Sequence, residues 1–277
     1  MAVHETVTPS GISITFEDGE KGEDGKGKRR AYWVNGEKYP SITTITGQFE
    51  KPGLTWAAEK LTVEGCLNLA ADGELPNFTP AALSALKARG LRFDQVWRAK
   101  ADRGTLSHGD LLAFALGEEP SDLDAALPAE RGFLRGVAAF QVDHEPVAHH
   151  SEFMVGSPTF GFAGRPDFLG ELPKLREGVG LLELKTTEEI PRYASGLAKP
   201  PYTEAILQIG GQSKGCVESG YPVPEWAAVL RVEASGEYVL QEVPISHSGF
   251  LRALAVYNVN RELAAQAKAM VKEAAKA

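Results

Sequence analysis

Short alternations of apolar and polar residues open the chain. Residues 11–16 (GISITF) alternate as a half-buried strand does, and residues 31–34 (AYWV) begin a second strand. The stretch between them holds glycine and charged residues without an apolar one, which predicts a solvated loop. The Asn35-Gly36 pair is typical of a tight turn between paired strands. Residues 1–50 are therefore predicted to form β-hairpins.

Helical periodicity replaces alternation in the next part of the chain. Apolar residues at helical spacing predict a helix over residues 54–71. Thr79-Pro80 is typical of an N-cap followed by proline at the first helical position, and Gly90 ends that helix. One or two helices are expected within residues 93–116, and another over residues 128–142. A helical insertion thus follows the hairpins.

The later part of the chain alternates between short apolar runs and amphipathic stretches. In order, the patterns predict strands at residues 152–155, 166–169 and 181–185, a helix at 202–219, strands at 226–232 and 238–243, and an alanine-rich helix at 250–275. A fourth strand that is reached through a helix implies a mixed sheet flanked by helices. The predicted fold class is α/β, with residues 1–50 as a hairpin region and residues 51–277 as the main domain, in one compact unit.

The composition limits the classes of protein to which the chain could belong. The chain has 277 residues, of which 43% are hydrophobic and 24% charged, as in ordinary globular proteins. Cys66 and Cys216 are the two cysteines, too few for a disulfide framework or an iron–sulfur cluster, and they favour a reducing compartment. The opening residues lack the pattern of a signal peptide, and apolar runs are too short to span a membrane, so a cytoplasmic protein is expected. The net charge of −8 disfavours bulk attraction to nucleic acid but leaves room for a local basic groove.

Candidate chemistry gathers in the segment GRPDFLG and in the segment LLELKTT that follows it. Asp167 opens one predicted strand, and Glu183 and Lys185 lie two apart on the next, so their side chains share one face. Ionised groups inside an apolar run are costly unless they are paired or bound to metal. Two converging carboxylates suit Mg²⁺ or Mn²⁺, and a neighbouring ammonium could orient a metal-bound water. Taken alone, each residue also has an ordinary explanation, as a solvated strand end or half of an ion pair.

The surroundings of these residues resemble a known family. Residues 103–212 are similar to the RecB-like branch of the PD-(D/E)XK nucleases, whose fold is a restriction-endonuclease-like mixed sheet flanked by helices. Four segments carry the resemblance in matching order and spacing: RGTLSHGDL, SEFMVGSPTFGFAGRPDFLG, LLELKTT and ILQIGGQ. The missing iron–sulfur cysteines set the chain apart from many CRISPR-associated adaptation nucleases. They point to the related phage-type exonucleases, which lack the cluster.

The resemblance implies roles for individual residues. Asp167 and Glu183 would be metal ligands, the carbonyl group of Leu184 would complete the metal shell, and Lys185 would be the catalytic lysine. His108 would be a further ligand, whose imidazole tilts the preference from Mg²⁺ toward Mn²⁺.

Two more positions follow from the motifs, and one departs from them. Glu152 would be an acidic residue of the site, and Gln208 would contact the surroundings of Lys185 or the DNA. A tyrosine often follows that glutamine by four residues in the family, whereas this chain has Gln212, which leaves the role of the position open.

Cationic and aromatic residues near the motifs are candidates for contacts with DNA. Arg165, Arg103 and Lys199 could position the phosphate backbone without reading its sequence. Tyr202 follows a proline-rich stretch and could stack on a base, although packing explains it equally well.

The function expected from the sequence is that of a metal-dependent DNA exonuclease, which hydrolyses phosphodiester bonds in DNA recombination, replication or phage DNA processing. Two alternatives stay open: a structure-specific or nicking endonuclease of the same fold, and a non-catalytic DNA-binding subunit. The expected cofactor is Mg²⁺ or Mn²⁺, and the expected partner is DNA. The C-terminal helix is a candidate docking element for a single-strand annealing protein, and the oligomeric state is left open.

Overall fold

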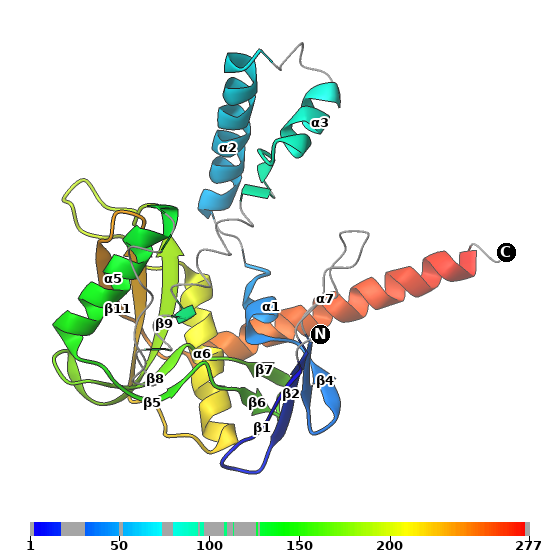
Figure 1. Cartoon of the computed structure of the whole chain (residues 1–277). Helices are drawn as coiled ribbons and strands as arrows, with labels where there is room; N and C mark the ends of the chain where they lie inside the picture. Colours follow the sequence, from blue (N-terminus) through cyan, green and yellow to red (C-terminus); the bar gives the residue numbers. More distant parts are fainter. Residues whose placement is uncertain are drawn as a thin grey trace.

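The structure is a computed structural model that describes residues 3–17, 31–49, 52–73, 80–93, 95–96, 108–109, 113, 126 and 128–274. Two sheets and a small ribbon form its β structure (Figure 1). Helices cover both faces of the larger sheet, so the predicted mixed α/β class is confirmed. No helix within these residues combines the length and the apolar character needed to cross a bilayer.

The N-terminal sheet contains four antiparallel strands in chain order. They are β1 (Val3–Val7), β2 (Ser13–Glu17), β3 (Ala31–Val34) and β4 (Glu37–Tyr39). Asn35 and Gly36 have φ values of 50° and 82°, as a two-residue hairpin with the right-handed strand twist requires. The two predicted strands and their turn are confirmed, and β1 adds a strand ahead of them.

The central sheet has five strands in the order β11-β10-β9-β8-β5. Their bounds are Val147–Ser151 for β5, Phe168–Leu172 for β8, Arg176–Thr187 for β9, Trp226–Glu233 for β10 and Tyr238–Glu242 for β11. β9 and β10 are parallel, and the other pairs are antiparallel. The parallel pair is joined by α6 (Thr203–Ser219), the crossover helix that the sequence predicted.

The strand predicted at residues 152–155 is wrong. β5 ends at Ser151, and β6 (Val155–Ser157) pairs instead with β7 (Phe162–Gly164) in a separate ribbon. Glu152 lies between them with a φ of 49°, a left-handed conformation that ends regular strand pairing. The strand predicted to begin at Pro166 starts two residues later, at Phe168.

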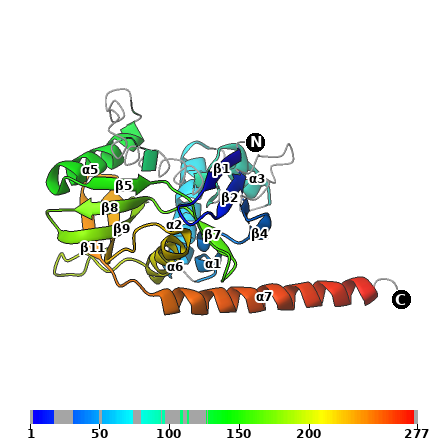
Figure 2. The same ribbon diagram turned by 90° about the horizontal axis from the view of Figure 1, so that it is seen from below.

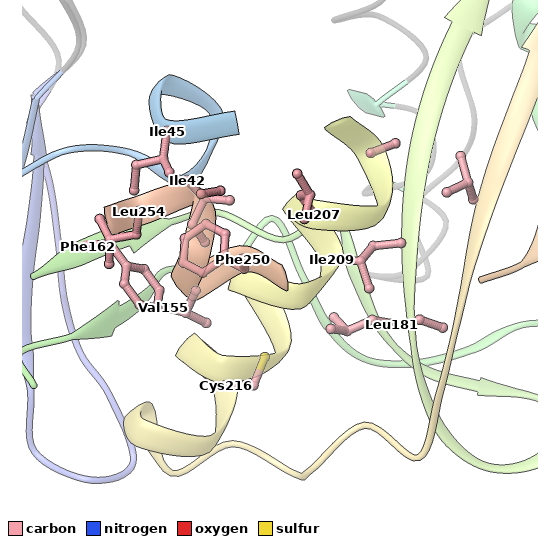
Figure 3. Packing of buried hydrophobic residues seen from close by; sticks show 14 of the residues in the cluster. Ile42, Ile45, Val155, Phe162, Leu181, Leu207, Ile209, Cys216, Phe250 and Leu254 are labelled. Carbon is pink, nitrogen blue, oxygen red and sulfur yellow. The ribbon is translucent and has the colours of Figure 1, made fainter. Parts of the chain in front are cut away.

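Two apolar layers lie against the central sheet. On one face, α5 (Pro128–His144) packs on side chains such as Leu182 and Leu184. On the other face, α6 packs on the side of the sheet that carries Leu181, and the first turns of α7 (His247–Ala274) and the short α1 (Ile42–Thr46) pack against α6. Figure 3 shows this second layer, in which Phe250 of α7 lies beside the residues of α6.

The helices outside the core complete the chain. α2 (Pro52–Ala71) and α3 (Pro80–Ala88) match the predicted helices and stand apart from the central sheet in Figure 1. Most of residues 93–116 lies outside the described residues. The second half of α7 is exposed and extends away from the body of the molecule (Figure 2).

Candidate metal centre

The centre of β9 carries the pair that the sequence singled out. Glu183 and Lys185 project toward α6, and Nζ of Lys185 lies 2.5 Å from Oε1 of Glu183. The Glu183 side chain is only 1% exposed. Gln208 of α6 donates from Nε2 to the same carboxylate oxygen over 2.6 Å and accepts from Lys185 over 3.2 Å. The three side chains thus form a closed hydrogen-bonded group, in which Glu183 is buried and Lys185 is partly exposed.

The other oxygen of Glu183 has a donor of its own. Nε2 of Gln212, one helical turn beyond Gln208, lies 2.6 Å from Oε2 of Glu183. Two amides from one face of α6 therefore hold both oxygens of the carboxylate.

Asp167 lies just before β8 and is fixed through its main chain and its side chain. Its carbonyl oxygen accepts from the hydroxyl of Ser151 over 2.8 Å and from the N–H of Glu152 over 3.1 Å. Its Oδ2 accepts from the N–H of Leu184 over 2.7 Å. This last bond brings the carboxylate of Asp167 beside the strand that carries Glu183.

His108 and Glu152 complete an acidic cluster around the free oxygen of Asp167. Nδ1 of His108 lies 3.1 Å from Oδ1 of Asp167 and 3.5 Å from Oε1 of Glu152. One ligand atom from each of the three residues lies within 4.8 Å of the others. Arg165 contacts the second oxygen of Glu152, with 2.7 Å between Nε and Oε2.

The electrostatics of the cluster reflect its crowded carboxylates. Burial, with the charge of Asp167, raises the pKa of Glu183. Burial would also raise the pKa of Asp167, but His108 and Lys185 outweigh it and hold that pKa below its usual range. Burial opposes the positive charge of His108, yet the neighbouring carboxylates raise its pKa to about 10. Burial also opposes the positive charge of Lys185, but the charges of Glu183 and Asp167 raise its pKa.

This donor set fits a hard divalent cation. Carboxylate oxygens are the ligands that Mg²⁺ and Mn²⁺ prefer, and a single imidazole is compatible with Mn²⁺. Buried carboxylates that repel one another gain from a cation between them, because the charge of the cation offsets their desolvation. Asp167, Glu152 and His108 offer the converging ligand atoms, and Glu183 lies beside them.

The candidates for DNA contacts fall in different places. Arg165 lies at the cluster itself, through its contact with Glu152. The carbonyl oxygen of Lys199 accepts from Arg231, which is in register with Lys185 on the neighbouring strand. Tyr202 is half exposed and directly precedes α6.

Arg103 lies outside the described residues. Gln212 had no role predicted from the sequence, and Arg231 was not among the predicted site residues. A signal existed for Arg231, because it is a charged residue inside the buried run of β10.

Comparisons with known proteins gave structural neighbours alone. No protein-family model matches the chain, and no curated protein matches it. Among solved structures, it is similar to an alkaline exonuclease from Laribacter hongkongensis and to the same enzyme in complex with dAMP. Each match has a TM-score of 0.34 and 16% identity, and covers 61% of this chain and 84% of the other. Likeness at this level assigns neither an activity nor a substrate to this chain.

Proposed function

We propose that this chain is a metal-dependent DNA nuclease, and specifically an exonuclease. One observation carries the proposal: His108, Glu152 and Asp167 converge within 4.8 Å, beside the pair of buried Glu183 and partly exposed Lys185. The charges of Glu183 and Lys185 both act on Asp167, and we take the carboxylates as cation ligands and the ammonium as their catalytic partner. Metal-assisted hydrolysis of a phosphodiester can use this combination of groups, because the cation activates water and the ammonium offsets developing negative charge.

The cation site would be formed by Asp167, Glu183, Glu152 and His108, with the carbonyl group of Leu184 as a further ligand. A divalent cation bound there would act as a Lewis acid toward the phosphate and lower the pKa of the attacking water. Mg²⁺ or Mn²⁺ fits the oxygen-rich donor set, and the imidazole favours Mn²⁺.

Lys185 is the group that would act on the reacting atoms from the protein side. Its ammonium is held by Glu183 and Gln208, so its position is set before any substrate arrives. A fixed cation beside the scissile phosphate stabilises the negative charge that develops in the transition state, without any cost of reorganisation. Gln208 keeps that ammonium in place.

The exonuclease assignment and the role in DNA recombination, replication or phage DNA processing rest on the motif order shared with phage-type exonucleases. Arg165, Lys199 and Tyr202 would contact the DNA backbone or a base around the cluster, and Arg103 is a further candidate. A single-strand annealing protein is the partner that this role would involve.

The test compares an end-labelled linear duplex with a covalently closed circle, each in Mn²⁺, Mg²⁺ or EDTA. We expect degradation of the linear DNA alone, and only with a cation. Replacing Asp167, Glu183 or Lys185 singly by alanine should abolish it. Cleavage of the circle would indicate an endonuclease. DNA binding without cleavage on linear, nicked and single-stranded substrates would indicate a binding subunit.

A further inference from the structure

Gln212 occupies an unusual position for an amide side chain. The residue is 1% exposed and lies on the face of α6 that covers the cluster. Its Nε2 is the donor to Oε2 of Glu183. Its own carbonyl oxygen, Oε1, is buried and has no hydrogen-bond partner among the described residues.

A buried acceptor without a donor is costly, because it loses the hydrogen bonds that it makes with water in the unfolded chain. The amide could avoid this cost by turning outward, but the bond to Glu183 holds it in place. The surrounding contacts confine the helix itself, since a Cβ at Gly211 would lie 2.6 Å from Cε2 of Phe250. The side chain therefore presents an acceptor next to a carboxylate that we have placed in the cation site.

We propose that Gln212 is a positioning residue for the cation site. It fixes the direction of Glu183 Oε2, and its Oε1 accepts a hydrogen bond from water that enters with a hydrated divalent cation. The inference rests on the proposed function, because it takes Glu183 as a cation ligand. Mg²⁺ and related cations keep several of their waters when bound to proteins, so the site needs acceptors as well as ligands.

Gln208 and Gln212 have different tasks in this arrangement. Gln208 joins Glu183 to Lys185 and so affects the ammonium as well as the carboxylate. Within the part of the chain that the structure describes, the side chain of Gln212 is hydrogen-bonded to the carboxylate and not to Lys185. Loss of Gln212 should weaken cation binding with little effect on Lys185, whereas loss of Gln208 should affect both.

The experiment measures Mn²⁺ binding by calorimetry to the full chain without DNA, for wild type, Gln212→Met, Gln212→His and Gln208→Met. Gln212→Met keeps the length of the side chain and removes both polar groups. We expect it to bind Mn²⁺ about 10- to 100-fold more weakly, the usual effect of losing a group that orients a ligand. Gln212→His should recover part of the affinity, because a neutral imidazole keeps one donor and one acceptor.

Cleavage assays over a range of Mn²⁺ concentrations separate the two amides. The rate of Gln212→Met should return toward wild type at saturating Mn²⁺, whereas that of Gln208→Met should stay low. Thermal unfolding in EDTA checks that each variant is folded, and Gln212→His carries the test if Gln212→Met is not.

The possible outcomes separate the role of Gln212 from the proposed nuclease function. Wild-type Mn²⁺ affinity in a folded Gln212→Met, with DNA cleavage by the wild-type chain intact, would overturn the role of Gln212 and leave the nuclease proposal standing. A wild-type chain that neither binds Mn²⁺ nor cleaves DNA would overturn both.

Discussion

The main-chain N–H of Leu184 donates a hydrogen bond to Oδ2 of Asp167 over 2.7 Å, and this bond joins the two acidic segments of the site. Oδ1 of Asp167 is left to face His108 at 3.1 Å. One oxygen of the carboxylate thus bonds to the main chain of β9, and the other faces the cluster. The role of the Leu184 carbonyl group as a ligand stays a prediction.

Replacement of Asp167 by asparagine separates these two roles. The amide oxygen can still accept from Leu184, so the fold should persist, but the negative charge that attracts a cation is gone. We expect cleavage to fall at least about 100-fold, since losing even an orienting group costs 10- to 100-fold. The measurement is the initial rate on linear duplex DNA in Mn²⁺. Glu171→Gln, on the strand that follows Asp167, removes an exposed carboxylate paired with His149 and should leave the rate unchanged. Equal losses in the two variants would point to stability rather than to the site.

His108 should set the preference between cations. Imidazole nitrogen is a better ligand for Mn²⁺ than for Mg²⁺, so His108→Gln should lower the rate in Mn²⁺ more than the rate in Mg²⁺. The quantity to measure is the ratio of the two rates at saturating cation. His149→Gln provides the control, because this histidine pairs with Glu171 away from the cluster. An unchanged ratio in His108→Gln would remove His108 from the set of ligands.

Much of the fold could be predicted because local patterns and tertiary packing agree. Residues 181–185 are apolar apart from Glu183 and Lys185, and they form the centre of β9 with both faces covered. The first half of β9, from Arg176 to Gly180, is polar and glycine-rich, so periodicity gave no sign of its length. The error at Glu152 has a different cause. Its left-handed backbone is stabilised by a hydrogen bond to Asp167, a contact between residues far apart in the sequence.

The site was predictable where it depends on strand geometry and hidden where it depends on packing. Spacing alone placed Glu183 and Lys185 on one face. Gln212 gave no comparable signal, because a polar residue on an amphipathic helix is usually solvated. Only the approach of α6 to β9 turns that residue toward a buried carboxylate.

Close packing at Gly211 should couple stability to the site. An alanine in the middle of a helix usually stabilises relative to glycine by about 0.5–1 kcal/mol. Here the added Cβ would lie 2.6 Å from Cε2 of Phe250, so we expect Gly211→Ala to lower both the melting temperature and the Mn²⁺ affinity, by displacing α6. Adding Phe250→Leu should restore part of the Mn²⁺ affinity, even if the enlarged cavity keeps the melting temperature low. No recovery in the double variant would show that the clash is not the cause.

Tyr238 should govern stability at high pH. Its hydroxyl donates to Oδ2 of Asp143 over 2.6 Å, which ties β11 to α5. Burial, with this bond and the charge of Asp143, raises the pKa of Tyr238 from 10.0 to about 12. Because the folded state binds the proton more tightly, this contribution is complete below pH 10 and is lost as the pH rises from 10 to about 12. Tyr238→Phe should therefore lower the free energy of unfolding at neutral pH and flatten its decline over that range, measured by urea unfolding. A parallel decline in both proteins would exclude Tyr238 as the titrating group.

Arg165 should contribute to DNA binding through the phosphate backbone. Its side chain is 40% exposed, so the guanidinium can contact a phosphate while Nε holds Glu152 at 2.7 Å. Each phosphate contact releases counterions, and losing one should reduce the slope of log affinity against log salt by about 1. We expect Arg165→Gln to weaken binding at low salt by a similar factor for unrelated DNA sequences and to show this smaller slope.

Fluorescence anisotropy with Ca²⁺ in place of the catalytic cation measures the DNA affinity at each salt concentration. Arg176→Gln is the matched control, because this exposed arginine pairs with Glu242 at the other end of β9. If both variants kept the wild-type slope, Arg165 would serve only to orient Glu152, and the DNA would follow another path across the molecule.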